Sequence, residues 1–138
     1  MARPEPARCA TLFVYGTLMR TSGRPLARKL VNQSIFLGLG WISARLYSLG
    51  SYPGAVRSKE PRDKVYGEAV RLLSPAMSLA WLDRYEGCLQ GGLEPQAYER
   101  VILPVTLKSG GQLNAWVYVY NLPVSGARRL PDGRFMPG

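Results

Sequence analysis

The chain reads Phe13-Val14-Tyr15-Gly16-Thr17-Leu18-Met19 near its start, an apolar run that breaks at a glycine. The β-branched and aromatic residues from Thr11 to Tyr15 favour a strand, which we expect Gly16 to end. Glycine permits close backbone approach, and successive N–H groups at such a break can bind an anion. An ordinary strand-to-turn transition accounts for the same residues, so the run alone leaves both interpretations open.

A second run, Leu82-Asp83-Arg84-Tyr85-Glu86-Gly87, ends the segment that we predict to be the main helix. Ser74 followed by Pro75 is typical of a helix N-terminus, with a cap and then a proline at the first helical position. Gly87 stands where a C-terminal glycine is expected. The pattern therefore predicts a helix from Pro75 to Glu86.

Glu86 continues an apolar row on this helix, because Leu79, Leu82 and Glu86 are spaced i, i+3 and i+7. Burial and the negative end of the helix dipole should both raise the pKa of its carboxyl toward the range useful for acid–base catalysis. The competing interpretation is a solvent-facing Glu86 at a frayed end, paired with a lysine or arginine. A second apolar stripe leads us to expect a mostly buried helix: Met77, Trp81 and Tyr85.

The rest of the pattern predicts many strands and one further helix, which together indicate an α+β fold with a strongly curled or closed sheet. The short helix should begin at Pro25 and run to about Val31. We expect strands at 34–44, 45–49, 65–72, 100–107 and 112–120, the last two forming a hairpin around 108–111. Residues 50–55 should form a turn, 88–97 a loop, and the tail from Pro123 an irregular segment.

Composition narrows the possible chemistry. The 138 residues contain no histidine, which excludes Ser-His-Asp and Cys-His catalysis and imidazole-ligated metals. The two cysteines, Cys9 and Cys88, have no metal-ligand spacing. No apolar run approaches the ~20 residues that span a bilayer, and the polar, proline-broken start does not resemble a signal peptide. We therefore expect a cytoplasmic protein with no membrane partner.

The net charge of +9 is compatible with an anionic small molecule or with nucleic acid. The basic residues are spread along the chain, and no recognition helix or RNP-type aromatic motif accompanies them. Charge alone is non-specific evidence. A basic nucleic-acid-associated domain thus stays as an alternative that the sequence does not favour.

Taken together, the motifs resemble those of the γ-glutamylcyclotransferase-like family, which includes the γ-glutamylamine cyclotransferases and the AIG2-like proteins. Each element is weak alone, but they occur in the family's order from residue 11 to about residue 121. The matching elements are Phe13–Leu18, Gly38 before Leu46-Tyr47, Tyr52-Pro53-Gly54, Val65–Glu68, Leu82–Gly87, Tyr98-Glu99-Arg100 and Val117–Tyr120.

The resemblance implies one γ-glutamylcyclotransferase-like domain over residues 1–138, with a core at about 10–121 and a small mixed closed or nearly closed β-barrel carrying one main helix. It implies Glu86 as the catalytic acid–base and the backbone of Tyr15, Gly16, Thr17 and Leu18 as the cradle for a γ-glutamyl substrate. Further implied pocket residues are Tyr52, Tyr98 and Tyr118, although the alternative that Tyr98 and Tyr118 merely cover a sheet face stays open.

The expected reaction is cyclisation of a γ-glutamyl amine or γ-glutamyl amino acid to 5-oxoproline, with no metal and no cofactor. The alternative within the family is a non-catalytic protein that binds a small carboxylated ligand, since a shared fold does not establish an activity. The sequence does not specify the leaving group, and we expect the loop 88–97 to shape that side of the pocket. It does not specify the oligomeric state or the role of the basic tail either.

Overall fold

The computed structural model describes residues 9–87 and 96–135. The predicted lead-in and most of the predicted loop 88–97 therefore lie outside the described residues. The elements are β1 (Thr11–Val14), the 3₁₀ helix η2 (Arg20–Ser22), α1 (Pro25–Asn32), β2 (Ser34–Ser48), β3 (Pro53–Arg57), β4 (Lys64–Leu72), α2 (Pro75–Glu86), β5 (Tyr98–Leu107), β6 (Gln112–Tyr120) and β7 (Arg128–Leu130).

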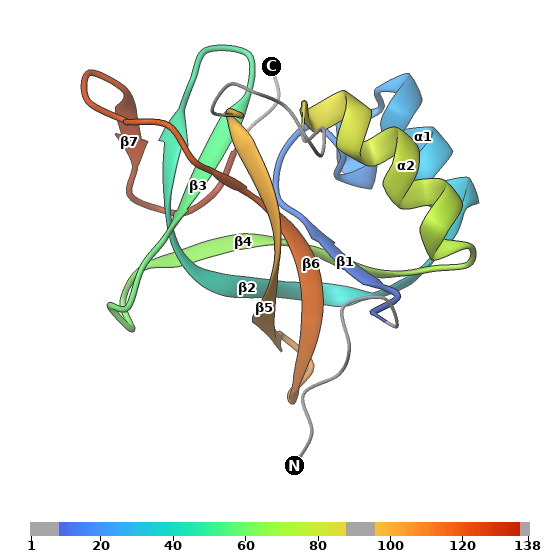
Figure 1. Cartoon of the computed structure of the whole chain (residues 1–138). Helices are drawn as coiled ribbons and strands as arrows, with labels where there is room; N and C mark the ends of the chain where they lie inside the picture. Colours follow the sequence, from blue (N-terminus) through green and yellow to red (C-terminus); the bar gives the residue numbers. More distant parts are fainter. Residues whose placement is uncertain (1–8, 88–95, 136–138) are drawn as a thin grey trace.

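Five strands form a closed barrel in the order β2-β4-β1-β6-β5, which returns to β2 (Figure 1). The predicted closure of the sheet is thus confirmed. β1 runs parallel to β6, whereas the other neighbouring pairs of the barrel are antiparallel. Closure occurs where Gly40 and Trp41 of β2 pair with Leu107 and Thr106 of β5.

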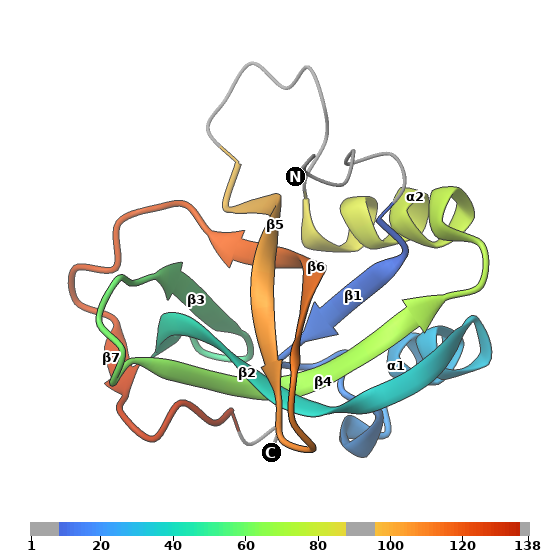
Figure 2. The same cartoon turned by 90° about the horizontal axis from the view of Figure 1, so that it is seen from below.

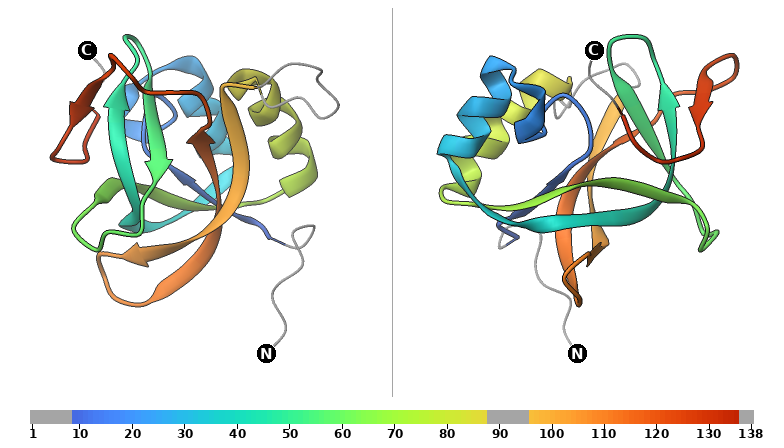
Figure 3. Two further views of the ribbon diagram at one scale, coloured as in Figure 1. Left: turned by 60° about the vertical axis from the view of Figure 1, so that its left-hand side comes forward. Right: turned by 180° about the vertical axis from the view of Figure 1, so that it is seen from behind.

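β2 is one continuous strand of 15 residues, which corrects the two separate strands predicted at 34–44 and 45–49. Its backbone is paired along its whole length, first with β4 from Ser34 to Ser43 and then with β3 from Ala44 to Ser48. The register with β4 shifts once, at a bulge between Phe36 and Gly38. The strand bends instead of ending, and it carries the chain from the helices to β3 and β7 (Figure 3).

Two further predictions were wrong because additional strands pair with the second half of β2. The predicted turn at 50–55 ends early, because Pro53 pairs with Ser48 and begins β3. The tail predicted to be irregular contains β7, whose residues 128–130 pair with Leu46–Ser48. β3 and β7 lie at the end of the barrel opposite α1 and α2 (Figures 1 and 2).

The strands bury both of their faces, in two separate clusters. Alternate residues such as Phe13 and Val117 fill the barrel interior. Their neighbours, such as Leu12, Val14 and Tyr118, face outward and pack with Leu30 of α1 and Leu82 of α2. Successive residues of β6 thus alternate between the two clusters, and the helices cover one outer face of the barrel (Figure 2).

The helix α2 has the predicted bounds, and Gly87 adopts the left-handed conformation with φ 74° that a C-terminal glycine allows. Ser74 precedes the helix but makes no side-chain cap hydrogen bond. The expectation of a mostly buried helix was wrong, because Met77 is 55% exposed and only Ser78 and Leu82 are fully buried. The helix lies on the barrel surface with one face covered. In the described part of the chain, no helix has the length and apolarity needed to cross a membrane.

Candidate active site

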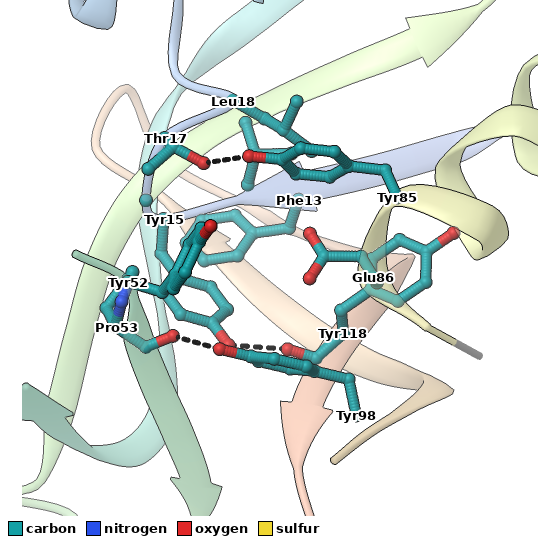
Figure 4. Close-up of a pocket in the computed structure, with 12 residues that line it drawn as sticks. Phe13, Tyr15, Thr17, Leu18, Tyr52, Pro53, Tyr85, Glu86, Tyr98 and Tyr118 are labelled. Atoms are coloured by element: carbon teal, nitrogen blue, oxygen red, sulfur yellow. Dashed lines mark hydrogen bonds between the residues drawn. The ribbon is translucent and has the colours of Figure 1, made fainter. Parts of the chain in front are cut away.

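A pocket of about 190 Å³ lies between the C-terminal end of α2, the turn after β1, and the first residues of β3 and β5 (Figure 4). All eight residues predicted for the site line it: Tyr15, Gly16, Thr17, Leu18, Tyr52, Glu86, Tyr98 and Tyr118. The two motifs far apart in the sequence thus meet at one cavity. The contribution of each residue to substrate binding stays a prediction.

Glu86 is the last residue of α2, and its carboxyl group points into the pocket (Figure 4). Burial raises the pKa of this carboxyl from 4.5 to about 7. Within the described residues no lysine or arginine forms an ion pair with it. The solvent-facing alternative does not describe this side chain. At neutral pH the group can both accept and donate a proton.

A direct hydrogen bond joins the two motifs. The hydroxyl groups of Thr17 and Tyr85 lie 2.8 Å apart, one in the turn after β1 and the other in the last turn of α2. Sequence reasoning placed Tyr85 in an apolar stripe and missed it as a pocket residue, although it lines the cavity beside Glu86. Its position next to Glu86 in the motif was the available signal. The bond fixes the helix end against the turn.

Gly16 lets the turn pass close to the start of β3. A Cβ atom on this residue would lie 2.6 Å from Cγ of Pro53, so any side chain would displace the proline ring. Pro53 itself lines the pocket and was quoted only as part of a turn motif. The glycine therefore brings the turn and the first residues of β3 together on one side of the cavity.

Tyr15 forms part of the pocket wall from within the barrel. Its side chain is buried, and its hydroxyl donates a 2.5 Å hydrogen bond to the carbonyl oxygen of Tyr118. The hydroxyl oxygen of Tyr15 also accepts a 3.2 Å hydrogen bond from the backbone N–H of Ala55. One phenol thereby joins β1 to β6 and β3 directly beneath the cavity.

The other three predicted tyrosines form walls and a rim. The hydroxyl of Tyr98 donates to the carbonyl oxygen of Pro53 at 2.7 Å, and that of Tyr118 donates to the carboxylate of Asp83 at 2.6 Å. Burial, together with the nearby Glu86 carboxylate, raises the pKa of the Tyr98 phenol above its usual range. Tyr52 is 52% exposed and stands at the mouth.

Asp83, one turn before Glu86, holds α2 to the barrel. Its carboxylate accepts two hydrogen bonds from Arg100 of β5, at 2.8 and 3.2 Å, in addition to the one from Tyr118 of β6. The guanidinium group of Arg100 also lies 4.2 Å from the ring centre of Trp116. A bidentate arginine–carboxylate pair is geometrically specific. It orients the helix turn that carries Glu86.

The chain matches a known protein family over most of its length. Residues 12–137 match the family model described as "Gamma-glutamyl cyclotransferase, AIG2-like". The γ-glutamylcyclotransferase family protein YtfP of Escherichia coli K12 is 31% identical over 125 residues, covering 91% of this chain and 95% of the relative. The chain therefore belongs to the AIG2-like γ-glutamylcyclotransferase family.

Solved structures show the same fold. The solution structure of YtfP from Escherichia coli has a TM-score of 0.62 over 91% of this chain and 96% of its own. An AIG2-like protein from Mus musculus is 26% identical, with a TM-score of 0.65 over 83% of this chain and 80% of its own. YkqA from Bacillus subtilis, 22% identical, has a TM-score of 0.67 over 92% of this chain, which spans only 39% of that protein.

Proposed function

We propose that the protein is a γ-glutamylcyclotransferase-type enzyme that converts a γ-glutamyl amine or γ-glutamyl amino acid to 5-oxoproline. The α-amine of the substrate attacks its own γ-carbonyl carbon, a C–N bond of the lactam forms, and the amide bond to the leaving nitrogen breaks. Because the nucleophile is tethered, holding the two groups in contact supplies much of the catalysis, with about 7–11 kcal/mol as an upper range. The reaction needs neither a metal nor a cofactor.

Glu86 moves the protons in this proposal. The α-ammonium carries three protons and the lactam nitrogen retains one, so two protons must leave it, while the departing nitrogen gains the same number to become an ammonium group. A carboxyl whose pKa lies at about 7 can accept a proton from the attacking nitrogen and return it to the leaving nitrogen. General acid–base catalysis of this kind contributes about 10²–10⁴-fold.

The turn at residues 15–18 would hold the α-carboxylate of the γ-glutamyl group through its backbone N–H groups. Those residues line the pocket opposite Glu86, and Gly16 lets the turn approach Pro53 closely. The aromatic walls formed by Tyr98 and Tyr118 would exclude water from the reacting groups. The single observation that carries the proposal is the buried carboxyl of Glu86 facing this turn in one small cavity.

The test is release of 5-oxoproline from γ-glutamyl amines and γ-glutamyl dipeptides by the purified protein and by Glu86→Gln. We expect turnover by the wild type and a loss of at least about 10²-fold in the variant. Glu60→Gln is the matched control, because Glu60 is exposed in the loop before β4 and should leave activity unchanged. Undiminished turnover in Glu86→Gln would remove Glu86 from the mechanism. Binding of γ-glutamyl compounds without any turnover would favour the non-catalytic alternative.

A further inference from the structure

Glu68 is a buried carboxylate that the proposed reaction does not use. On β4 it continues the row of alternate residues that faces the helices, after Leu72 and Val70, and interrupts their apolar pattern. The residue is only 4% exposed. A carboxylate removed from water in this way is costly unless it is hydrogen-bonded. Its partners therefore indicate what it does.

The partner of Glu68 is the end of the turn that lines the pocket. Its Oε1 accepts a 2.9 Å hydrogen bond from the backbone N–H of Arg20, the first residue of η2. The Arg20 side chain is half exposed, and its Nε lies 4.0 Å from Oε2. The hydrogen bond from the backbone is therefore the shorter of the two contacts. Because the first N–H groups of a helix have no partner within the helix, Glu68 supplies the acceptor that the Arg20 N–H needs.

The strand register places the other end of the same turn at Glu68. Val14, the last residue of β1, pairs with Glu68 in the antiparallel ladder between β1 and β4. The chain then passes through residues 15–19 and returns at Arg20 to the Glu68 side chain. Both ends of the segment that lines the pocket are thus attached to one residue.

Beyond Tyr15, whose hydroxyl bonds to neighbouring strands, local bonds shape the segment. The N–H of Met19 donates to the carbonyl oxygen of Gly16 at 3.1 Å, and the hydroxyl of Ser22 donates to that of Thr17 at 2.6 Å. Across the pocket, the Thr17 hydroxyl contacts Tyr85. These bonds shape the turn, whereas the Glu68 contact fixes its return end to the barrel.

We infer that Glu68 is a positioning residue, which holds the backbone of residues 15–18 at the spacing that a substrate carboxylate requires. The inference rests on the proposed function. Among the described residues, Glu68 is not one of those that line the pocket, so it acts through the backbone and leaves the proton transfer to Glu86. Its loss should weaken substrate binding and leave the ionisation of Glu86 unchanged.

Four variants separate the hydrogen bond from the charge. Glu68→Gln keeps an acceptor oxygen, and Glu68→Ala removes it. Arg20→Ala keeps the backbone N–H and removes the guanidinium group, whereas Arg20→Pro removes the N–H as well. Proline fits this position, because Arg20 is the first residue of η2 and Met19 before it is extended, with φ −62° and ψ 140°.

We expect Glu68→Ala and Arg20→Pro to raise KM by about tenfold, with kcat and the pH midpoint of kcat/KM close to those of the wild type. Hydrogen exchange at the amides of residues 16–19 should accelerate by a similar factor in the protein without substrate. Glu68→Gln and Arg20→Ala should resemble the wild type in both measurements. If Glu68→Ala does not fold, Arg20→Pro tests the inference instead, because that variant retains the Glu68 carboxylate.

The inference would be overturned if Arg20→Pro showed the amide exchange rates and the KM of the wild type. It would also be overturned if Glu68→Gln raised KM and accelerated exchange as much as Glu68→Ala does. Failure of the proposed function has a different signature, namely a wild-type protein that releases no 5-oxoproline. In that case the exchange rates at residues 16–19 alone decide whether Glu68 holds the turn.

Discussion

A single carboxyl group, that of Glu86, has a property that sets it apart from an ordinary surface glutamate. The side chain stands at the end of α2 in a cavity walled largely by aromatic rings, and burial there raises its pKa to about 7. Strongly shifted pKa values of this kind are concentrated at functional sites. The chemistry of the pocket therefore depends on how well water is kept from this group.

The pH dependence of activity should report this carboxyl. As a general base Glu86 must be ionised, so kcat/KM should rise with pH along an acidic limb whose midpoint is at about 7. A limb at 4.5, the ordinary pKa of a glutamate, would contradict a buried Glu86 in the protein without substrate. The measurement is kcat/KM for one γ-glutamyl substrate between pH 4 and pH 9, with Glu60→Gln as the control.

Gly16→Ala should damage the pocket without touching an ionisable group. The new methyl group would meet Cγ and Cδ of Pro53 at 2.6 and 3.0 Å, and the proline ring cannot rotate away. A displacement of about 1 Å at a substrate-binding element can cost about 10²-fold in rate. We expect kcat/KM to fall by that order, measured by steady-state kinetics, while Thr21→Ala, at an exposed position just beyond the turn, stays near the wild type.

Between elements, polar contacts on the two sides of α2 decide where Glu86 lies. Tyr85 binds Thr17 in the turn after β1, and Asp83 binds Arg100 and Tyr118 on the hairpin of β5 and β6. The apolar contact of Leu82 with the outer barrel face lies between them. The helix end is thus held from both sides of the pocket.

A double-mutant cycle should detect the contact between α2 and the turn. Thr17→Val and Tyr85→Phe each remove one hydroxyl, and their effects on the free energy of unfolding should be non-additive by about 0.5–1.5 kcal/mol. Urea denaturation measures the three variants. Tyr85→Phe combined with Ser58→Ala, which lies in the loop before β4, should be additive, and additivity in the first pair would contradict the contact.

At the opposite end of the barrel, Asp63 joins β7 to β2. Its carboxylate accepts hydrogen bonds from Arg45, Ser58 and Arg129, and these bonds, the one from Arg45 first, lower its pKa from 3.8 to about 2. The stabilising contribution is therefore present above pH 3.8 and is lost as the pH falls through about 2.

Asp63→Asn should loosen β7 at neutral pH. Amide exchange at residues 128–130 should accelerate relative to the wild type, and 1 M salt should reduce the difference because the two arginine side chains are exposed and screened. Asp132→Asn is the control, since the Asp132 side chain hydrogen-bonds only to Arg134 among the described residues. Unchanged exchange in Asp63→Asn would show that the backbone pairing of β7 with β2 suffices.

For the whole molecule, burying the Glu86 carboxyl lowers the free energy of unfolding at neutral pH, while the proposed activity depends on that burial. In the unfolded chain Glu86 ionises at about 4.5, and in the folded protein at about 7. Between these values the folded state keeps a proton that the unfolded state has lost, so stability falls as the pH rises through this window and then levels. Each tenfold change in proton affinity is about 1.4 kcal/mol, so the ionised group costs at most about 3 kcal/mol.

Glu86→Gln should therefore stabilise the protein while lowering the proposed activity. The gain in the free energy of unfolding should approach about 3 kcal/mol at pH 8 and vanish at pH 4, where the wild-type carboxyl is protonated in both states. Urea denaturation at the two pH values measures the difference. Glu60→Gln should show no such pH dependence, and a gain in Glu86→Gln that is equal at both pH values would contradict the buried ionisation.

The sequence by itself determined the elements whose signals are local. The bounds of α2 follow from Pro75 and Gly87, and the hairpin of β5 and β6 follows from its turn residues. The candidate role of Glu86 came from the resemblance of the motifs to a family, since its apolar row left a solvent-facing side chain open. Helix periodicity, capping and turn chemistry depend on residues within a few positions of each other. The order of the motifs indicated the family for the same reason, because each motif is contiguous.

Only the tertiary structure decided what depends on residues far apart in the chain. The continuity of β2 and the existence of β7 result from strand pairing, which local propensity does not encode. The contact of Thr17 with Tyr85 joins residues 68 positions apart, and the return of the turn at Arg20 to Glu68 joins residues 48 apart. Folding brings these groups within hydrogen-bond distance and removes water from the pocket, which is why the pKa of Glu86 and the position of the turn are properties of the fold.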